Sequence, residues 1–363
     1  MTKEDFLFML IRAALWDWRL KGEALPHPQF AALVKEAEKQ TVKGLMFQIF
    51  LNPDNGVRLG KYDAAEVYSS MMEVTTTNEK VNRELKELVM LLQSHEIHFV
   101  VVKGQTLAAL YSHPLNRTSG DIDFYVVPND FERAKVLIEK EWLVEFETDE
   151  DDGEQDQHIA FNRNDVEFEM HFELMKFQSE KVQKVFDRMI DTEPSYREVV
   201  GVMVPILNPE AELLYTFLHA FHHFIELGIG LRQICDIAIL LNQRVVDKDK
   251  VNRWLKELDF ERGFMVFEAI CVDKLRLPKE CLPVAIDEVD KKRMDEVLNV
   301  VFKRGNFGKY GRKNAVRSGI AYYIESFKLK IIHYIRFYSL CPREARATLF
   351  GGIPRKILMA VRR

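Results

Sequence analysis

Apolar residues recur at two different spacings along the chain, and the change of spacing divides it into three regions. Residues 1 to about 95 show the three- and four-residue spacing of amphipathic helices and no strand-like alternation. The clearest helical segment is 64–94, with apolar positions at Val67, Met71, Val74, Leu85, Leu88, Val89 and Leu92. At the N-terminus the same spacing predicts an amphipathic helix rather than a signal peptide, with one face formed by Phe6, Met9, Leu10 and Ala13.

Strand patterns begin at about residue 96 and continue to residue 206. Six segments are predicted as strands: 98–102, 121–127, 143–147, 158–162, 166–172 and 199–206. Helices at 106–111 and 129–140 are predicted to follow the first two strands. We expect the third and fourth strands to pair with each other across the acidic tract 148–156, which we interpret as a solvated loop.

The helical pattern returns after residue 207. Asn208 is a suitable N-cap, and Pro209 suits the first helical position. Gly228 and Gly230 end this helix, and 231–242 is predicted to begin the next one. The sequence therefore predicts an α+β fold with a small mixed β-sheet core. We place the domain boundaries so that the core is 96–206, the N-terminal helical region 1–95 and the C-terminal helical region 207–363.

Composition places the chain among ordinary folded proteins, because 47% of its residues are apolar. The four cysteines show no metal-ligand spacing, so we expect reduced thiols and a cytoplasmic location. No uninterrupted apolar run approaches the roughly 18 residues that a membrane span needs.

The net charge of -5 conceals a basic C-terminal segment. Residues 303–363 contain fifteen Lys or Arg and two acids. This segment predicts a contact with an anionic partner such as a membrane surface, a nucleic acid or the acidic remainder of the chain. A solvated basic face is an equally open interpretation. Within 322–338 we favour a stripe that faces the core, formed by Phe327, Ile331, Tyr334 and Phe337.

Two aspartates interrupt the apolar strand at 121–127, although carboxylates are rarely buried without a partner. Successive side chains of a strand point to opposite faces, so Asp121 and Asp123 share one face, with their Cα atoms about 7 Å apart. Carboxylates placed in this way can converge on one divalent cation or on a pair of cations. Because hard cations prefer oxygen ligands, the pattern predicts a site for Mg²⁺ or Mn²⁺.

A third acid lies on a later strand. The segment 166–173 alternates without a break, and its polar face consists of Glu167, Glu169, His171 and Glu173. Glu169 completes a group of three acids if this strand lies beside the strand of Asp121. His171 is then a candidate for orienting a metal ligand or for acting as a base. The alternative is an amphipathic strand with a wet face, and the alternation alone fits both.

The residues before the two aspartates favour a phosphate site. Lys103 and Gly104 close one strand and open a helix, where free backbone N–H groups and the helix dipole receive phosphate. Gly104 also lets a phosphate approach the backbone closely. Arg117 and Ser119 can add hydrogen bonds to a polyphosphate.

Taken together, these residues resemble the signature of the polymerase-β-like nucleotidyltransferase superfamily. More closely, they resemble its branch of uncharacterised nucleotidyltransferases. Three stretches carry the resemblance: Val102-Lys103-Gly104 through Asp121-Ile122-Asp123, then Phe168-Glu169-Met170-His171-Phe172, and finally His222-His223-Phe224 through Asp236. They cover roughly residues 96–245.

The resemblance implies a nucleotidyltransferase core in which three acids, here Asp121, Asp123 and Glu169, hold two metal ions. It implies transfer of a nucleoside monophosphate from an NTP, ATP by default, to an acceptor hydroxyl with release of pyrophosphate. Two positions depart from the superfamily pattern: Gln105 stands where a second Gly or a Ser is usual, and Glu169 where Asp is commoner.

Polar residues of the helices after residue 208 form a second group of candidates. The resemblance lets His223 line the nucleotide pocket. His219 and His223 are four residues apart, and we favour hydrogen-bonded polar side chains, where the helix meets the sheet, over a zinc site. Arg232 and Asp236 are also four apart and are predicted to pair, either at the surface or partly buried where they orient the site.

Two other functions stay open at the level of sequence. A glycosyltransferase with a metal-binding Asp-x-Asp motif uses similar residues, although such enzymes usually carry a longer α/β domain before the motif. A catalytically degenerate nucleotide-binding or interaction module is the second alternative, motivated by Gln105 and the unassigned basic segment.

Overall fold

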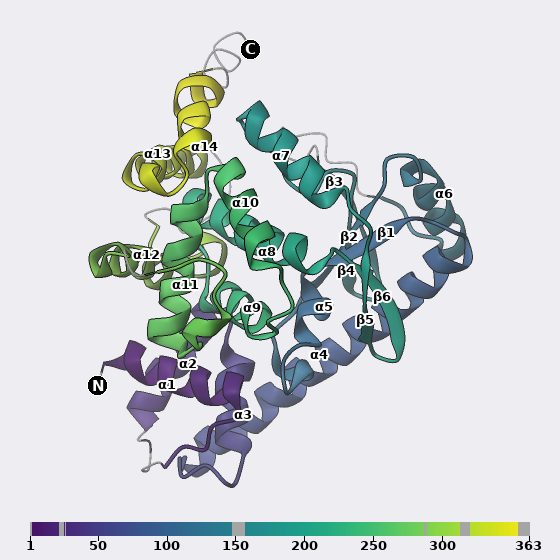
Figure 1. Ribbon diagram of the computed structural model, residues 1–363. Coiled ribbons are helices and arrows are strands. Elements are labelled where there is room, and N and C mark those ends of the chain that lie inside the picture. Colours follow the sequence, from purple (N-terminus) through teal and green to yellow (C-terminus); the bar gives the residue numbers. More distant parts are fainter. Residues whose placement is uncertain are drawn as a thin grey trace.

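Helices surround a small sheet in this protein (Figure 1). The structure is a computed structural model that describes residues 2–21, 25, 27–146, 157–286, 289–312 and 320–354. The N-terminal region is helical, as predicted, and its described helices are α1 (Lys3–Trp16), α2 (His27–Lys39), α3 (Lys43–Leu51) and α4 (Lys61–Ser94). Thr2 begins α1 as its N-cap, because its hydroxyl accepts the N–H of Asp5 while the Asp5 carboxylate accepts the N–H of Thr2.

Four strands form a mixed sheet in the order β1-β2-β4-β3. Their bounds are β1 (Phe99–Val102), β2 (Asp121–Val126), β3 (His158–Arg163) and β4 (Val166–His171). β2 is parallel to β4, whereas β1 pairs with β2 and β3 with β4 in antiparallel fashion. A parallel pair needs a crossover, and here the chain passes through α6 (Phe131–Trp142) and β3 between the two strands. A separate hairpin, β5 (Ser195–Val199) and β6 (Val202–Ile206), contacts β1 through β6.

One face of the sheet is apolar and is covered by α4 and α6. Its fully or almost fully buried side chains come from every layer: Val81, Leu85, Leu88, Ile122, Phe124, Ala134, Ile138, Phe161, Phe168 and Met170. The rings of Phe161 and Phe168 stack across β3 and β4 with their centroids 4.7 Å apart. Because successive side chains of a strand point to opposite faces, the polar side chains of β2 and β4 lie on the other face, toward the C-terminal helices.

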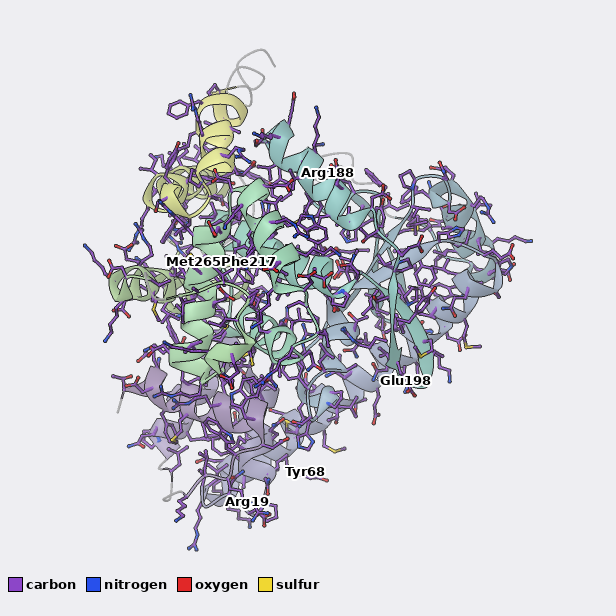
Figure 2. The ribbon with its side chains drawn as sticks, in the orientation of Figure 1. Arg19, Tyr68, Arg188, Glu198, Phe217 and Met265 are labelled. Atoms are coloured by element: carbon purple, nitrogen blue, oxygen red, sulfur yellow. The ribbon has the colours of Figure 1, made fainter. Side chains whose placement is uncertain are left out.

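The C-terminal helices pack around a second apolar core. Their bounds are α7 (Glu180–Ile190), α8 (Pro209–Glu226), α9 (Leu231–Asn242), α10 (Lys248–Leu258), α11 (Glu261–Leu275), α12 (Lys291–Arg304), α13 (Ile320–Arg336) and α14 (Pro342–Ala347). Phe217 of α8 lies inside this core (Figure 2), with its ring centroid 4.9 Å from that of Phe264 on α11. Short helices complete the chain: α5 (Gly104–Ala108), η1 (Pro114–Asn116), η2 (Lys279–Cys281), η3 (Asn306–Gly308), η4 (Tyr338–Leu340) and the π-helical η5 (Thr348–Gly352).

The long helix α4 belongs to both cores. Near its start, Val67 and Met71 pack with the helical core beside α3, whereas Leu85 and Leu92 pack with the core of the sheet. Figure 1 shows α4 running from the N-terminal helices to the far side of the sheet. None of the described helices combines the length and the apolar character that crossing a bilayer requires.

The predicted α+β fold with a small mixed sheet is confirmed, but one strand prediction is wrong and another is correct only in part. Residues 143–146 form no strand, because Leu143 ends α6 in the left-handed conformation, with φ 53°, and β3 pairs with β4 instead. The remaining residue of that prediction, and the acidic tract after it, lie outside the described residues. The strand expected at 199–206 is present only as β6, at 202–206, because Val200 and Gly201 turn the chain with φ 47° and 78° and the preceding residues form the partner strand β5. The division into three domains stays a prediction.

The stripe expected in the basic C-terminal segment faces the core only in part. Tyr334 and Phe337 are buried, whereas Phe327 and Ile331 are half-buried. Residues 313–319 and 355–363 of this segment lie outside the described residues, so a contact with an anionic partner stays a prediction.

Gly230 gives a direct test of helix packing. A Cβ at this N-cap of α9 would lie 2.6 Å from the carbonyl oxygen of Gln40 and 2.9 Å from its carbonyl carbon. Gly230→Ala must therefore displace α9 from the end of α2, and we expect the free energy of unfolding to fall by about 1–3 kcal/mol in urea denaturation. Gly351→Ala is the matched control, because a Cβ there meets no atom within 4 Å. An equal loss in both variants would contradict this explanation.

Candidate active site

Three carboxylates converge on the polar face of the sheet. Asp121 and Asp123 come from β2 and Glu169 from β4, and the parallel register places Asp123 directly beside Glu169. One carboxylate oxygen of each residue lies within 4.8 Å of those of the other two. This spacing lets all three oxygens contact a common ion, and carboxylate oxygens are the ligands that Mg²⁺ and Mn²⁺ prefer.

Asp123 is the most deeply buried of the three, at 2% exposed. Lys103 Nζ lies 2.8 Å from its Oδ1, and His171 Nε2 lies 3.0 Å from the same atom. Burial opposes ionisation of Asp123, but the charge of Lys103 and the hydrogen bond from His171 hold its pKa well below the ordinary value. Asp123 is therefore a carboxylate at neutral pH.

The ionisation of Asp121 is opposed by its surroundings. The charge of Asp123 raises the pKa of Asp121, and burial raises it further. A divalent cation would relieve this repulsion, because it is the largest local charge wherever it binds. His171 Nε2 also lies 3.4 Å from Glu169 Oε2, so this one ring contacts two of the acids.

The turn between β1 and α5 has an unusual backbone. Lys103 has φ 57° and ψ -143°, and Gly104 has φ 43°. Such values are sparsely populated by residues with a Cβ, so the surrounding contacts must hold Lys103 in place. A Cβ at position 104 would lie 3.8 Å from the hydroxyl of Ser119, and that hydroxyl is buried without a hydrogen-bond partner. An unpartnered hydroxyl beside a bare glycine fits the close approach of an anionic oxygen.

The helix after this turn is shorter than expected. The sequence predicts a helix at 106–111, whereas α5 covers only Gly104–Ala108. Gln105, which departs from the superfamily pattern, is buried, and its amide donates to Asn82 Oδ1 at 2.8 Å and to the Asn78 carbonyl at 3.2 Å. The Gln105 side chain therefore points to α4 and leaves the acids unobstructed.

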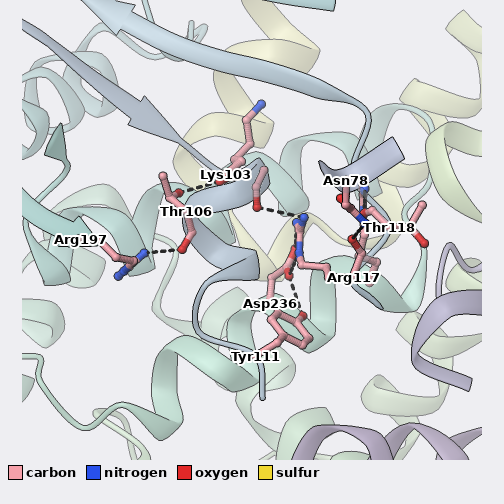
Figure 3. A network of polar contacts seen from close by, with 10 residues as sticks. Asn78, Lys103, Thr106, Tyr111, Arg117, Thr118, Arg197 and Asp236 are labelled. Atoms are coloured by element: carbon pink, nitrogen blue, oxygen red, sulfur yellow. Dashed lines mark hydrogen bonds and ion pairs between the residues drawn. The ribbon is translucent and has the colours of Figure 1, made fainter. Parts of the chain in front are cut away.

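A buried ion pair joins the turn to α9 (Figure 3). Arg117 donates from Nε and Nη2 to the two oxygens of Asp236 at 2.7 and 2.8 Å, and from Nη1 to the Gly104 carbonyl at 3.1 Å. The Tyr111 hydroxyl donates to Asp236 Oδ1 at 2.7 Å. The structure thus differs from the expected phosphate contact of Arg117, because this 3% exposed guanidinium is already engaged. It holds the backbone of the turn instead.

The predicted pairing of Arg232 with Asp236 also needs correction. Asp236 is engaged by Arg117, and Arg232 Nη1 donates to the carbonyl of Thr118 at 2.7 Å. Arg232 therefore holds the segment that leads into β2. From the other side, Arg197 of β5 donates to the Thr106 carbonyl at 2.9 Å, so the turn is anchored on two sides (Figure 3).

Histidines of α8 continue the polar contacts away from the acids. His219 Nε2 lies 3.2 Å from Lys103 Nζ, and His223 Nε2 lies 3.3 Å from His219 Nε2. Burial and then the charge of Lys103 lower the pKa of His219, while burial and then His222 lower the pKa of His223 to about 3. Both rings are therefore neutral at pH 7. They are hydrogen-bonded side chains at the junction of helix and sheet, as the sequence favours.

Sequence reasoning missed His158 and Asn78. His158 lies on β3 opposite His171, in a register set by the two-residue turn Asn164–Asp165, whose φ values of 50° and 53° suit a tight hairpin. The turn dipeptide Asn164-Asp165 could have predicted this pairing of β3 with β4.

Asn78 stands on the apolar stripe of α4, and its amide donates to the carbonyls of Leu115 and Arg117 at 2.8 and 3.0 Å. Its position as a polar residue on an apolar helix face could have indicated that its side chain makes a specific contact.

Residues 26–273, more than half of the chain, match the model of a protein family described as uncharacterised nucleotidyltransferase. The chain belongs to this family. The match includes the strands that carry the acids and extends beyond the 96–245 segment of the sequence resemblance, from α2 to α11. No curated protein matches the chain.

Among solved structures, the chain is similar to an antigenic nucleotidyltransferase-like protein from Paracoccidioides brasiliensis. The two are 16% identical, and the TM-score is 0.36. The similarity covers 56% of this chain and 93% of the other.

Asp236→Asn tests the buried ion pair. The substitution keeps the size of the side chain but leaves the charge of Arg117 uncompensated in the interior, and we expect a loss of about 3–5 kcal/mol in the free energy of unfolding. Asp165→Asn is the control, because Asp165 pairs with Lys80 at the surface and its side chain is 94% exposed. Unchanged stability of Asp236→Asn in urea denaturation would show that the pair does not hold the turn.

The lowered pKa of His223 predicts that stability depends on pH. Its pKa is about 3 in the folded chain and about 6.5 when unfolded, so only the unfolded chain takes up this proton as the pH falls below about 6.5. The folded state therefore loses about 2 kcal/mol between pH 7 and pH 5 through this residue. We expect His223→Asn to show a smaller fall over the same range in urea denaturation. Parallel stability curves for the two proteins would contradict a neutral His223.

Proposed function

We propose that this protein is a metal-dependent nucleotidyltransferase that moves a nucleoside monophosphate from an NTP to an acceptor hydroxyl and releases pyrophosphate. The observation that carries the proposal is the convergence of Asp121, Asp123 and Glu169 beside the turn at Gly104. Membership of the nucleotidyltransferase family supports the class of reaction.

The donor set fits the proposed Mg²⁺ or Mn²⁺. All three ligands are carboxylates, and hard cations beside phosphates are usually held by such oxygens. Asp123 is ionised at neutral pH, and the raised pKa of Asp121 reports repulsion that a cation relieves. When bound, the ion would neutralise charge on the phosphates and activate the acceptor hydroxyl.

The turn at Gly104 is proposed to receive the triphosphate. The bare Gly104 backbone and the unpartnered hydroxyl of Ser119 lie next to each other, and the ammonium of Lys103 lies 2.8 Å from Asp123. Because burial lowers the pKa of Lys103 less than the charge of Asp123 and its neighbours raises it, Lys103 stays a cation. Arg117 supports this site indirectly, by holding the carbonyl of Gly104.

In this proposal the residues position the two substrates and stabilise the charge of the transition state. The acceptor oxygen forms a bond to the α-phosphorus while the bond from that phosphorus to the pyrophosphate oxygen breaks. The hydroxyl proton passes to solvent. His171 would orient Asp123 and Glu169 through its contacts of 3.0 and 3.4 Å, and the partly buried His223 would line the pocket for the nucleotide.

We propose ATP as the nucleotide. A cytoplasmic location fits the four cysteines, all of which are free and buried.

Transfer of label tests the proposed reaction. The full chain is incubated with each NTP, labelled at the α-phosphate, together with Mg²⁺ or Mn²⁺ and a cell extract. We expect label in an acceptor, and a loss of at least about a hundredfold in Asp121→Asn, Asp123→Asn and Glu169→Gln, because each removes a charge that holds the metal. Asp165→Asn, an exposed acid in the turn between β3 and β4, is expected to label like the wild type.

The same experiment separates the rival functions. Labelling that survives Asp121→Asn combined with Asp123→Asn would remove these acids from the mechanism. Consumption of a nucleotide-sugar without pyrophosphate release would identify a glycosyltransferase. Metal-dependent NTP binding without any labelled acceptor would identify a degenerate nucleotide-binding module.

A further inference from the structure

Two histidines and an acid form a second group beside the three carboxylates. His158 of β3 lies opposite His171 of β4, with the ring centroids 4.9 Å apart. Glu169 lies on the same face, with Oε1 4.0 Å from His158 Nε2 and Oε2 3.4 Å from His171 Nε2. One possible ligand atom from each of the three residues falls within 4.8 Å of the others.

The surroundings of this group leave coordination capacity unused. Because Nε2 of His171 donates to Asp123, Nδ1 is the ring nitrogen with a lone pair for a cation, and this atom is buried without a hydrogen-bond partner in a residue that is 6% exposed. Buried polar atoms of native proteins are almost always paired, so an orphaned ring nitrogen calls for a ligand or another explanation. Glu169 pairs with Ala160, a small residue, across the β3–β4 ladder.

From this geometry we infer that His158, Glu169 and His171 form a second cation site, one that takes a borderline transition-metal ion such as Zn²⁺ or Co²⁺. Imidazole nitrogen suits these ions, whereas the three-carboxylate site offers only oxygen and suits Mg²⁺ or Mn²⁺. Two histidines and one carboxylate leave a coordination position open, as catalytic zinc sites do. The inference goes beyond the proposed nucleotidyl transfer and does not depend on it.

Glu169 belongs to both groups and makes them neighbours. Its Oε1 lies 4.0 Å from His158 Nε2, and its Oε2 lies 3.4 Å from His171 Nε2, an atom that also contacts Asp123, so this carboxylate links the two groups. The second site is also more accessible than Asp123, since the side chain of His158 is 25% exposed and that of Asp123 is 3% exposed. An ion can therefore reach His158 while Mg²⁺ occupies the carboxylates.

Cobalt spectroscopy tests this site without any assay of activity. The full chain is titrated with Co²⁺ in the presence of saturating Mg²⁺, and the visible absorption of the ion reports its nitrogen ligands. We expect binding in the wild type, competition by Zn²⁺, and affinity that is weaker by more than about tenfold in His158→Gln, since loss of even an outer-shell partner costs that much. Asp121→Asn is expected to keep the nitrogen-ligated spectrum, because it alters only the carboxylate site.

His222→Gln is the matched control, since it removes another accessible histidine, one that pairs with Glu226 at 3.6 Å on α8. Equal Co²⁺ affinity of the wild type and His158→Gln would overturn the inference, and so would displacement of Co²⁺ by Mg²⁺. If His158→Gln does not fold, the wild type decides the matter. Zn²⁺ must then protect His158 from carbethoxylation, and unprotected modification would overturn the site.

Discussion

Parallel pairing of β2 with β4 aligns Asp123 with Glu169, and the convergence of the three acids depends on this register. The other face of the same strands is fully apolar and packs under α4 and α6, so a slip by one residue would bury the acids in hydrocarbon. The hydrophobic core therefore fixes where the carboxylates lie. Lys103 and His171 then hold Asp123 ionised within a nearly inaccessible place.

Besides packing in the two cores, helices α4 and α9 also hold the turn at Lys103 and Gly104. Lys103 and Gly104 adopt positive φ values, which a free chain would rarely adopt with a lysine at the first position. Arg117 holds the carbonyl of Gly104 and is itself held by Asp236 on α9. Asn78 on α4 in turn donates to the carbonyl of Arg117. Residues far apart in sequence thus support a backbone shape that local preferences oppose.

Strands, helices and the faces of strands could be predicted from the sequence, because they depend on neighbouring residues. Alternation identified β2 and β4 and assigned Asp121, Asp123 and Glu169 to one face, and the helix 231–242 was predicted at its observed bounds. Pairings that depend on distant residues were missed. Arg117 was expected at phosphate, because nothing local indicates that Asp236, more than a hundred residues later, engages it. His158 was missed because its strand was assigned to the wrong neighbour.

Continuous helix from Lys61 to Ser94 has a mechanical consequence. At 1.5 Å per residue it is a rod of about 50 Å, and its two ends are embedded in different cores. A flexible linker would let the helical core move relative to the core of the sheet. A continuous helix that belongs to both cores resists bending where they meet. Movement of the two cores relative to each other therefore requires α4 to bend or unwind.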